Sequence, residues 1–468
     1  MPISPSGAAT LSIADLRTSV KGRVSAPGDE EYDEVRAVFL GGIDRRPAVI
    51  IRVADADDVA TVVALAGDTG LELAIRSGGH SVYAVSEGGI VLDLSDMKAF
   101  EVDPVERTAW AEAGLTAAEY TGLAAADGLA TGFGDTGSVG IGGITLGGGV
   151  GYLVRKYGMT IDNLLAAEIV TANGELLHID ADSHPDLFWA IRGGGGNFGV
   201  VTRFKFRLHK VETIVGGMMI LPATPKVIAG FIAEAEAAPD GLSTIANVMP
   251  APPMPFLPEE QHGLPVIMAL MAYAGEVEAG EHLMDRFRAL AAPIVDMVKA
   301  MPYPEIYPPD EEGYHPIAAG RTLFVDSIDE GIATSILDYL ATSTAPMRVA
   351  QLRVLGGAMS RVPVDATAFA HRSSPILVNL AAVYESPEDA GKHEIWVAGF
   401  VSMLAGKDSG AYVGFLDEGE GSIHRAYPGP TLDRLKAVKG RYDPTNLFHF
   451  NHNVSPECID QSELTRVN

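Results

Sequence analysis

Cysteine is almost absent from this sequence. The 468 residues include one cysteine, Cys458, so no intrachain disulfide can form and the disulfide framework of small secreted proteins is excluded. No uninterrupted apolar run reaches the roughly 18 residues of a membrane-spanning helix. Residues 1–20 lack the basic start and apolar centre of a secretory signal. We therefore expect a cytoplasmic protein without a membrane partner.

Basic residues are also in short supply. Lysine and arginine number 34 against 61 aspartates and glutamates, which gives a formal net charge of −27 at pH 7. Such a surface repels the phosphates of DNA and RNA, so a nucleic-acid partner is not expected, and solubility alone explains the acidic exterior. With 47% hydrophobic and 20% charged residues, the chain has the composition of a globular protein with two or three cores.

Glycine, in contrast, is abundant and concentrated in two stretches. Residues 75–81 read Ile-Arg-Ser-Gly-Gly-His-Ser, and residues 137–151 read Gly-Ser-Val-Gly-Ile-Gly-Gly-Ile-Thr-Leu-Gly-Gly-Gly-Val-Gly. Backbone of this kind can adopt positive φ and present bare N–H groups, which suits a pyrophosphate. His80 stands near the end of the first stretch, where a ligand held by those amides would pass beneath its ring.

The first half of the chain reads as two small units of strands and helices. In the first unit, Asp55 is placed to cap a helix. In the second, Asn-Gly between two apolar runs predicts a hairpin. The expected helices cover 33–39, 55–66 and 116–126, and the expected strands cover 48–53, 73–75, 89–94, 107–113, 165–172, 175–179 and 200–208.

After about residue 210 the glycine-rich loops end and strand patterns alternate with helical ones, which predicts an α+β cap. Two proline-rich segments, 250–265 and 301–316, are expected to be surface loops that line a substrate entrance. The expected strands cover 216–221, 266–273, 348–355 and 375–384, and the expected helices cover 227–237, 279–290 and 431–439.

Two segments, 132–137 and 194–199, match the pattern G-x-G-x-x-G, so a nicotinamide-binding Rossmann fold is an alternative. That fold requires the pattern to follow a strand and open a helix, and neither segment does so. A chain with 52 glycines produces such matches easily. The Rossmann interpretation is therefore not favoured.

The two glycine stretches together resemble the FAD-binding signature of the flavoprotein oxidases of the vanillyl-alcohol oxidase and berberine-bridge-enzyme type. Their order and spacing make the resemblance specific, and it extends over nearly the whole chain through further matching segments at Arg36, 44–47, 57–59, 92–94, 156–158, 162–163, 186–201, 442–448 and 451–453. It implies an α+β fold, with a PCMH-type FAD-binding domain of two α/β subdomains and an antiparallel-sheet substrate domain covered by helices. The implied domains are 1–210, 211–415 and 416–468, the last returning to the FAD domain.

By this resemblance, the flavin 8α-methyl carbon is bonded to His80, whereas the alternative is a structural histidine. In many relatives a second covalent bond joins flavin C6 to a cysteine of the protein. This chain has Thr136 at the matching position, so it resembles the branch of the family in which FAD is held by one covalent bond. The implied FAD-binding residues are Arg76, Ser77, Gly78, Gly79, His80, Ser81, Val82, Thr136, Gly137, Ser138, Val139, Gly142, Gly143, Leu146, Gly148, Gly149, Tyr152, Asn197, Gly199, Val200, Val201, Asn451 and Asn453.

Several of these residues also have plainer interpretations. Arg76 is either a structural loop arginine or an anchor near phosphate, and each asparagine is either a cofactor contact or a turn former. Ala84 stands where relatives often have glycine, which would change the shape of the first loop.

The candidate substrate-side residues are Tyr412, Gln351, Arg353 and Asn379. Gln351 and Arg353 point to one face of a strand, which is either a floor over the flavin or an exposed strand face. Relatives usually read Tyr-x-Asn around Tyr412, and Gly414 replaces that amide. Because the Gln351 amide does not titrate, we expect Tyr412 or a substrate-ionised phenol to act as the base. His449 and His452 have no further ligand at metal-binding spacing, so no metal site is expected.

These observations predict an FAD-dependent oxidase. It would transfer a hydride from a small alcohol, amine or phenolic natural product to the flavin, with O₂ reduced to H₂O₂. One alternative is an oxidative cyclase or oxygenase of natural-product biosynthesis on the same scaffold. Another is a catalytically silent flavin-binding protein, because a fold alone does not guarantee chemistry. The identity of the substrate and the oligomeric state, including a homodimer, stay open.

Overall fold

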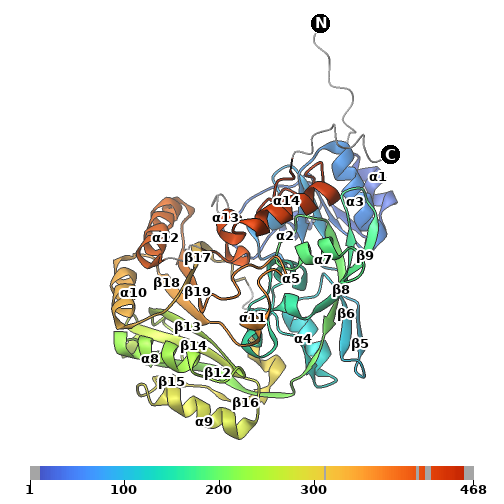
Figure 1. Ribbon diagram of the computed structural model, residues 1–468. Helices are drawn as coiled ribbons and strands as arrows, with labels where there is room; N and C mark the ends of the chain where they lie inside the picture. The colour runs from blue at the N-terminus through green and yellow to red at the C-terminus, as the bar shows by residue number, and fades with distance from the viewer. Residues whose placement is uncertain (1–10, 310–312, 407–409, 417–422, 458–468) are drawn as a thin grey trace.

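The computed structural model describes residues 11–309, 313–406, 410–416 and 423–457. The chain forms two halves that lie side by side (Figure 1). One half contains a four-stranded and a five-stranded sheet, and the other is built on an eight-stranded antiparallel sheet. This arrangement confirms the expected α+β class. None of the helices among the described residues is long and apolar enough to cross a membrane.

The first sheet has the strand order β1-β2-β4-β3, in which β2, β4 and β3 are parallel. Asp55 caps α3 as expected, because its carboxylate accepts hydrogen bonds from the N–H groups of Asp57 and Asp58. These elements are β1 (Arg23–Ser25), β2 (Val49–Arg52), α3 (Ala56–Thr69), β3 (Leu73–Arg76) and β4 (Ile90–Asp93), preceded by α1 (Ile13–Ser19).

The helix expected over 33–39 was wrong in its extent. Only a single turn forms, α2 (Tyr32–Val35). The chain then leaves the helix because the Phe39 N–H pairs with the Gly79 carbonyl at 3.0 Å. This bond brings residues 37–39 against the first glycine stretch, so a longer helix would remove one wall of that loop.

The second sheet has the order β5-β6-β10-β8-β9 and is antiparallel throughout. The expected hairpin is confirmed: β8 and β9 pair across Asn173-Gly174, where Gly174 has φ 79°. The elements are β5 (Phe100–Asp103), β6 (Thr108–Glu112), α4 (Ala117–Ala125), β7 (Leu129–Ala130), α5 (Ile141–Gly147), α6 (Val154–Tyr157), β8 (Leu164–Val170), β9 (Leu176–Asp180), α7 (Pro185–Ile191), β10 (Val200–Arg207) and β11 (His209–Lys210).

The large sheet has the order β15-β12-β14-β13-β18-β19-β17, with β16 paired to β12. Its strands are β12 (Thr213–Pro222), β13 (Leu242–Pro250), β14 (Pro265–Tyr273), β15 (Val295–Asp296), β16 (Lys299–Pro302), β17 (Ile317–Val325), β18 (Met347–Val354) and β19 (Ile376–Tyr384). Its helices are α8 (Pro225–Glu236), α9 (Val277–Arg288), α10 (Glu330–Thr342) and α12 (Ala390–Leu404).

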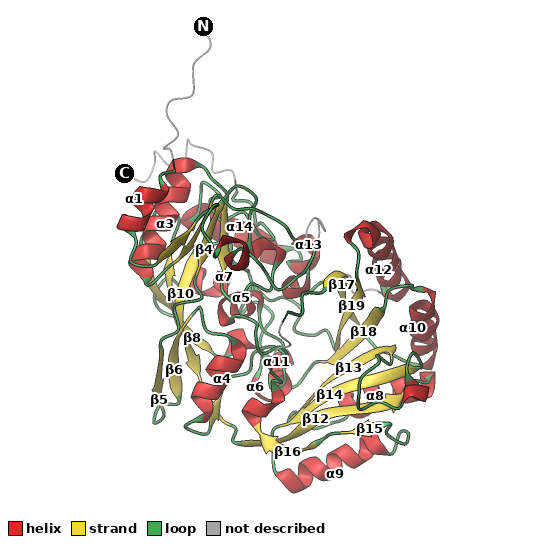
Figure 2. Ribbon diagram, turned by 180° about the vertical axis from the view of Figure 1, so that it is seen from behind, coloured by secondary structure: helices red, strands yellow, loops and turns green. Residues whose placement is uncertain are grey.

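The two faces of this sheet differ. On the outer face, residues such as Val248, Ile267, Leu352 and Leu380 are completely buried, and α8, α9, α10 and α12 cover this side of the sheet (Figure 2). The inner face is turned toward the first half and consists largely of half-buried residues, among them Met218, Asn247, Met268, Val349, Gln351 and Asn379. Strand alternation explains the division, because successive side chains point to opposite sides.

The C-terminal segment returns to the first half, where α14 (Pro430–Tyr442) packs against α7 (Figure 1). The ammonium of Lys439, which is completely buried, donates to the Asp443 carboxylate and to the carbonyls of Asn197 and Phe448. This lysine therefore fastens the returning segment to the loop after α7. Two further short helices are α11 (Ala358–Arg361) and α13 (Ile423–Ala426).

Residues 301–307 do not form the surface loop that the prolines of 301–316 suggested, and residues 310–312 of that segment lie outside the described residues. Tyr303 and Tyr307 are buried, and the Tyr307 hydroxyl donates to the Gly134 carbonyl at 3.0 Å. Aromatic rings bury enough apolar area to hold such a segment against the core despite its prolines. The Tyr307 contact fixes the chain just before the second glycine stretch.

Candidate functional site

The two glycine stretches meet backbone to backbone. A Cβ on Gly78 would collide with the Gly140 backbone, and a Cβ on Gly140 would collide with Ser77. The Ser77 hydroxyl donates to the Ala113 carbonyl at 2.6 Å, which ties the first loop to the second sheet. Glycine is therefore needed here for close approach, as expected from the pattern.

His80 lies at this junction. Its Nε2 is 3.0 Å from the Ser138 hydroxyl of the second stretch, and its ring stacks on Phe39 with the centroids 4.1 Å apart. Gly79, which precedes it, has φ 73°. The structure thus places the expected attachment residue between both loops, on a backbone that turns where glycine is required.

Arg76 is the last residue of β3 and is buried. Its guanidinium contacts the Asp93 carboxylate at 2.7 Å and the Val35 carbonyl at 2.8 Å, so it joins β3 to β4 and α2. Burial raises the pKa of Asp93, but Arg76, the Ser95 N–H and Arg52 outweigh it and leave the pKa below its usual value. These contacts fit the structural interpretation of Arg76.

A cavity of about 280 Å³ opens at the carboxyl ends of the parallel strands. Ligands of open α/β sheets bind at this edge. The cavity is lined by Glu34, Val35, Ala37, Val38, Phe39, Arg52, Arg76, Ser77, Gly78, Gly79, Asp93 and Ser95. Part of the predicted dinucleotide site is therefore hollow and bordered by the first glycine stretch.

The three asparagines expected to contact the cofactor divide into two kinds. Asn197 is saturated by the protein: its amide donates to the carbonyls of Gly194 and His452, and its oxygen accepts from the Val454 N–H. The side-chain oxygens of Asn451 and Asn453, in contrast, are buried and have no hydrogen-bond partner among the described residues. A buried oxygen that accepts no hydrogen bond lowers the stability of the fold unless a ligand or water donates one to it. These two oxygens are therefore suited to accept hydrogen bonds from a polar cofactor.

The remaining predicted FAD residues lie on the same framework. Ser81 caps the short turn at residues 82–84, and a Cβ on Gly149 would collide with Thr160. Gly148 and Gly149 have φ 127° and 77°. Gly142 lies beside Ser77, and Gly143 faces open space. Gly137, Val139 and Leu146 belong to the second glycine stretch, and Thr136 and buried Tyr152 directly flank it. Gly199 precedes β10, whose first residues are Val200 and Val201.

On the large sheet, Gln351 and Arg353 share the inner face, as the strand pattern predicted. The Gln351 oxygen accepts from Arg353 Nε at 2.9 Å, and its amide donates to Asn247 Oδ1 at 2.9 Å. Asn247 and Asn379 lie directly opposite Gln351 on the two neighbouring strands. The three amides therefore form a polar row across β13, β18 and β19.

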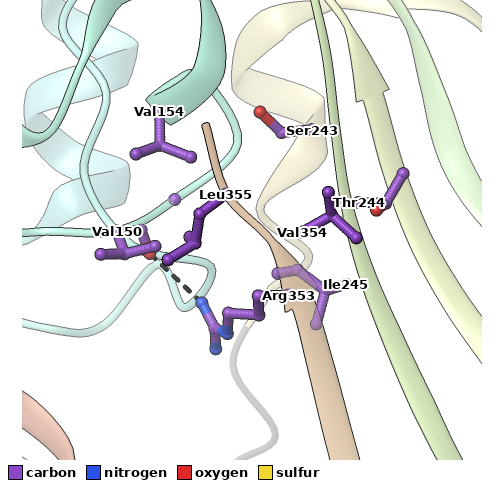
Figure 3. Close-up of a pocket in the computed structure, with 9 residues that line it drawn as sticks. Val150, Val154, Ser243, Thr244, Ile245, Arg353, Val354 and Leu355 are labelled. Atoms are coloured by element: carbon purple, nitrogen blue, oxygen red, sulfur yellow. Dashed lines mark hydrogen bonds between the residues drawn. The ribbon is translucent and has the colours of Figure 1, made fainter. Parts of the chain in front are cut away.

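Arg353 crosses from the large sheet to the first half. Its guanidinium donates to the Val150 carbonyl at 3.2 Å (Figure 3), contacts the Asp135 carboxylate at 2.8 Å, and lies over the Phe415 ring. The residue is only 3% exposed, so the alternative of an exposed strand face is wrong for Arg353. A charge buried between two halves persists because it is paired and hydrogen-bonded.

Tyr412 is buried at the same junction. Its hydroxyl accepts from the Gly149 N–H at 3.0 Å, and burial raises its pKa to about 12. The phenol is therefore protonated at neutral pH, which counts against Tyr412 as the base. Any Cβ at Gly414 would lie 2.8 Å from the Tyr412 ring, so the asparagine usual in relatives would displace this ring.

Sequence reasoning missed Asp135, Asn247 and Phe39. Asp135 is the acidic residue that directly precedes Thr136, and Asn247 is a lone amide within an apolar strand, so both carried a signal. Phe39 carried none, because its role depends on where the chain leaves α2. Within the described residues, no three histidine, cysteine, aspartate or glutamate side chains are arranged to hold a metal ion.

Two family models match the chain. Residues 47–180 match the FAD binding domain, and residues 411–455 match the berberine and berberine-like domain. These matches cover both glycine stretches, His80, Tyr412 and the asparagines near the C-terminus.

Relatives match over nearly the full length. The chain is 30% identical over 466 residues to (R)-6-hydroxynicotine oxidase of Paenarthrobacter nicotinovorans, covering 94% of this chain and 98% of the relative. A shorter match, 39% identical over 186 residues, links it to the FAD-dependent monooxygenase FUP4 of Fusarium proliferatum, covering 39% of this chain and 36% of the relative.

Among solved structures, 6-hydroxy-D-nicotine oxidase of Arthrobacter nicotinovorans superposes with a TM-score of 0.83 at 26% identity, covering 94% of this chain and 99% of the other. The structural likeness and the sequence identity extend over the same two halves. The chain therefore belongs to the family of FAD-linked oxidoreductases with a berberine-like C-terminal segment, and it is an FAD-dependent enzyme.

Proposed function

We propose that the protein is an oxidase that removes a hydride from a small organic substrate, with FAD bonded to His80 and O₂ reduced to H₂O₂. The observation that carries the proposal is the position of His80, held between the two glycine stretches by Phe39 and Ser138. A histidine at the meeting point of two amide-lined loops is placed to bond to the ring of a dinucleotide whose phosphates those loops hold.

The described residues fit such a cofactor. The cavity at Gly78 and Gly79 offers space and bare backbone, and the orphaned oxygens of Asn451 and Asn453 offer polar contacts. When bound, FAD supplies the acceptor for the hydride. With threonine at position 136, the attachment to His80 would be the single covalent bond.

The inner face of the large sheet would hold the substrate. Along β13, β14, β18 and β19, the side chains on this face are mostly apolar, and Arg353 is the only charged one. The amides of Gln351 and Asn379 would supply hydrogen bonds, while Met218 and Met268 would contact an apolar body. This lining suits an alcohol, amine or phenolic compound with few polar groups, oriented by Arg353 and Tyr412.

The attachment is tested by acid precipitation followed by mass spectrometry of the tryptic peptide that contains His80. We expect a mass increase equal to FAD less two hydrogens, and no such increase in His80→Ala. The activity is tested by measuring H₂O₂ release from the holoenzyme over a panel of alcohols, amines and phenols. A colourless protein that takes up no added FAD would contradict the proposal, and so would a yellow protein that consumes no O₂ with any compound.

A second candidate function is oxygenation of the substrate. The match to a monooxygenase over 186 residues favours it. Product formed under ¹⁸O₂ distinguishes the two, because an oxygenase retains labelled oxygen in the product whereas an oxidase releases it as H₂O₂.

Some expectations stay predictions. They are the domain boundaries at 210 and 415, and the cytoplasmic location. Limited proteolysis with identification of the stable fragments tests the boundaries. Fractionation of the producing cells tests the location.

A further inference from the structure

Asp135 stands where the two halves of the site face each other. Its carboxylate has one contact among the described residues, from Oδ2 to Arg353 Nη2 at 2.8 Å, and its side chain is 20% exposed. Oδ1 therefore keeps its lone pairs for another partner. A carboxylate with one oxygen anchored and the other available can receive a proton without moving.

The segment that carries Asp135 is held on both sides. The Tyr307 hydroxyl donates to the carbonyl of the preceding residue, Gly134. Three residues after Asp135, the Ser138 hydroxyl contacts His80. Asp135 thus lies on a short segment that is held before it by Tyr307 and after it by the contact between Ser138 and the expected attachment residue, His80.

The other polar groups around Asp135 cannot take a proton at neutral pH. Gln351 and Asn379 are amides, and Arg353 has only donors. Tyr412 keeps its own proton because burial raises its pKa to about 12. Burial, reinforced by the Asp135 carboxylate, raises the pKa of Tyr152. Burial together with the neighbouring Tyr303 and Tyr152 raises the pKa of Tyr307. This leaves the carboxylate of Asp135 as the acceptor.

We propose that Asp135 is the catalytic base and that Arg353 is its positioning residue. This inference rests on the proposed function and names the base of that reaction. In that reaction Asp135 Oδ1 would take the proton of the substrate O–H or N–H as the adjacent C–H bond gives up its hydride, so the substrate would lose two hydrogens and two electrons. Bound FAD would supply the acceptor for the hydride, O₂ would take up the two electrons and two protons and leave as H₂O₂, and Asp135 would pass its proton to water.

Arg353 sets the geometry of this base. Gln351 holds the guanidinium through Nε and Nη2, and Asn247 holds Gln351 in turn. The inner face therefore fixes the direction of the Asp135 carboxylate from a strand more than two hundred positions away in the sequence.

The test compares Asp135→Asn with Asp240→Asn, which removes a carboxylate from a surface ion pair with Arg361. Both variants are purified as holoenzymes and reduced anaerobically with a substrate found in the panel. We expect Asp135→Asn to reduce FAD at least about 100-fold more slowly and to lose the fall in rate at acid pH. Asp240→Asn should match the parent chain in both respects.

Two further measurements separate a base from a structural contact. In Asp135→Ala, added formate should restore part of the reduction rate, because a free carboxylate can enter the vacated space. In Asp135→Asn, the midpoint potential of the bound FAD should rise relative to Asp240→Asn, because a nearby negative charge has been removed. Should Asp135→Asn not accumulate as folded protein, Asp135→Ser replaces it.

Unchanged reduction rates in Asp135→Asn, or no rescue by formate together with an unshifted potential, would overturn the assignment. These outcomes leave the proposed function intact if the parent chain carries FAD on His80 and releases H₂O₂. A parent chain without these two properties refutes the proposed function itself, and the assignment of the base with it.

Discussion

The two halves of the candidate site are built from different materials. In the first half the site consists of backbone: Gly78 meets Gly140 without room for a side chain, and Gly149 adopts a conformation that other residues avoid. In the large sheet it consists of side chains, the row of Asn247, Gln351 and Asn379 with Arg353 beside it. A site made of backbone recognises what all dinucleotides share, whereas a site made of side chains can change its substrate by substitution alone.

The large sheet repeats this contrast on a smaller scale. Leu352 on the outer face is fully buried under helices, and its neighbour Gln351 on the inner face is half-buried and polar. A buried amide costs about 1 to 3 kcal/mol unless it is hydrogen-bonded. Within the large sheet the amides of Asn247, Gln351 and Asn379 lie on the inner face, where Gln351 bonds to Asn247 and all three stay half-buried.

The largest effect on stability is expected when a polar side chain is placed on the outer face of the large sheet, so that it resembles the inner face. Leu352→Asn places an amide in the outer core, and we expect it to lower the free energy of unfolding by about 4 kcal/mol through lost packing and an unsatisfied polar group. Urea unfolding followed by tryptophan fluorescence measures this. Val349→Asn, on the inner face of the same strand, should cost less than about 1 kcal/mol. Equal losses would show that the faces are not different.

A slightly smaller effect is expected in the backbone half. Gly140→Ala introduces a Cβ that collides with Ser77 and Gly78, so we expect a cost of about 3 kcal/mol and the loss of bound FAD. Gly122→Ala is the matched control, because this exposed glycine of α4 lies outside the predicted FAD site and its Cβ would meet nothing. The ratio of flavin absorbance to protein absorbance measures retention of the cofactor. Full retention in Gly140→Ala would contradict the close approach of the two loops.

Gln351→Leu sharpens the comparison within the side-chain half. The substitution leaves Arg353 Nε and Asn247 Oδ1 without their partner, which should cost about 1.5 kcal/mol. FAD retention should be normal, because the backbone half is untouched. Substrate affinity, measured by the change in flavin absorbance on titration, should fall about tenfold, which corresponds to roughly 1.4 kcal/mol. A loss of FAD in this variant would show that the halves are not independent.

The smallest effect is expected for Tyr412→Phe. It removes one hydrogen bond, from the Gly149 N–H, so we expect a cost of about 1 kcal/mol. Because the pKa of Tyr412 is about 12, the hydroxyl stays protonated across the neutral range. The shape of the rate profile between about pH 6 and pH 9 should therefore match that of the parent chain. If the fall in rate at low pH disappeared in Tyr412→Phe, Tyr412 would be the base after all.

Local signals predicted much of the framework. Asn173-Gly174 located a hairpin, Asp55 located a helix start, and alternation placed Gln351 and Arg353 on one face. The failures have a common cause. The helix over 33–39 and the loop over 301–316 were overridden by contacts with distant segments, through Phe39 to Gly79 and through Tyr307 to Gly134. Tertiary contacts of this kind outweigh the intrinsic preference of a short segment for a helix or a loop.

The sequence alone determined where backbone must be bare. The glycines at positions 78, 79, 140 and 149 can each be read from the sequence without knowledge of the fold. The same holds for His80 and for the threonine at position 136, where a second covalent link would need cysteine. Tertiary structure alone decided that Arg353 reaches Asp135, 218 positions earlier, and that Arg76 is occupied by Asp93. The reason is physical: conformational freedom is encoded locally, whereas the pairing of charges depends on which strands the fold brings together.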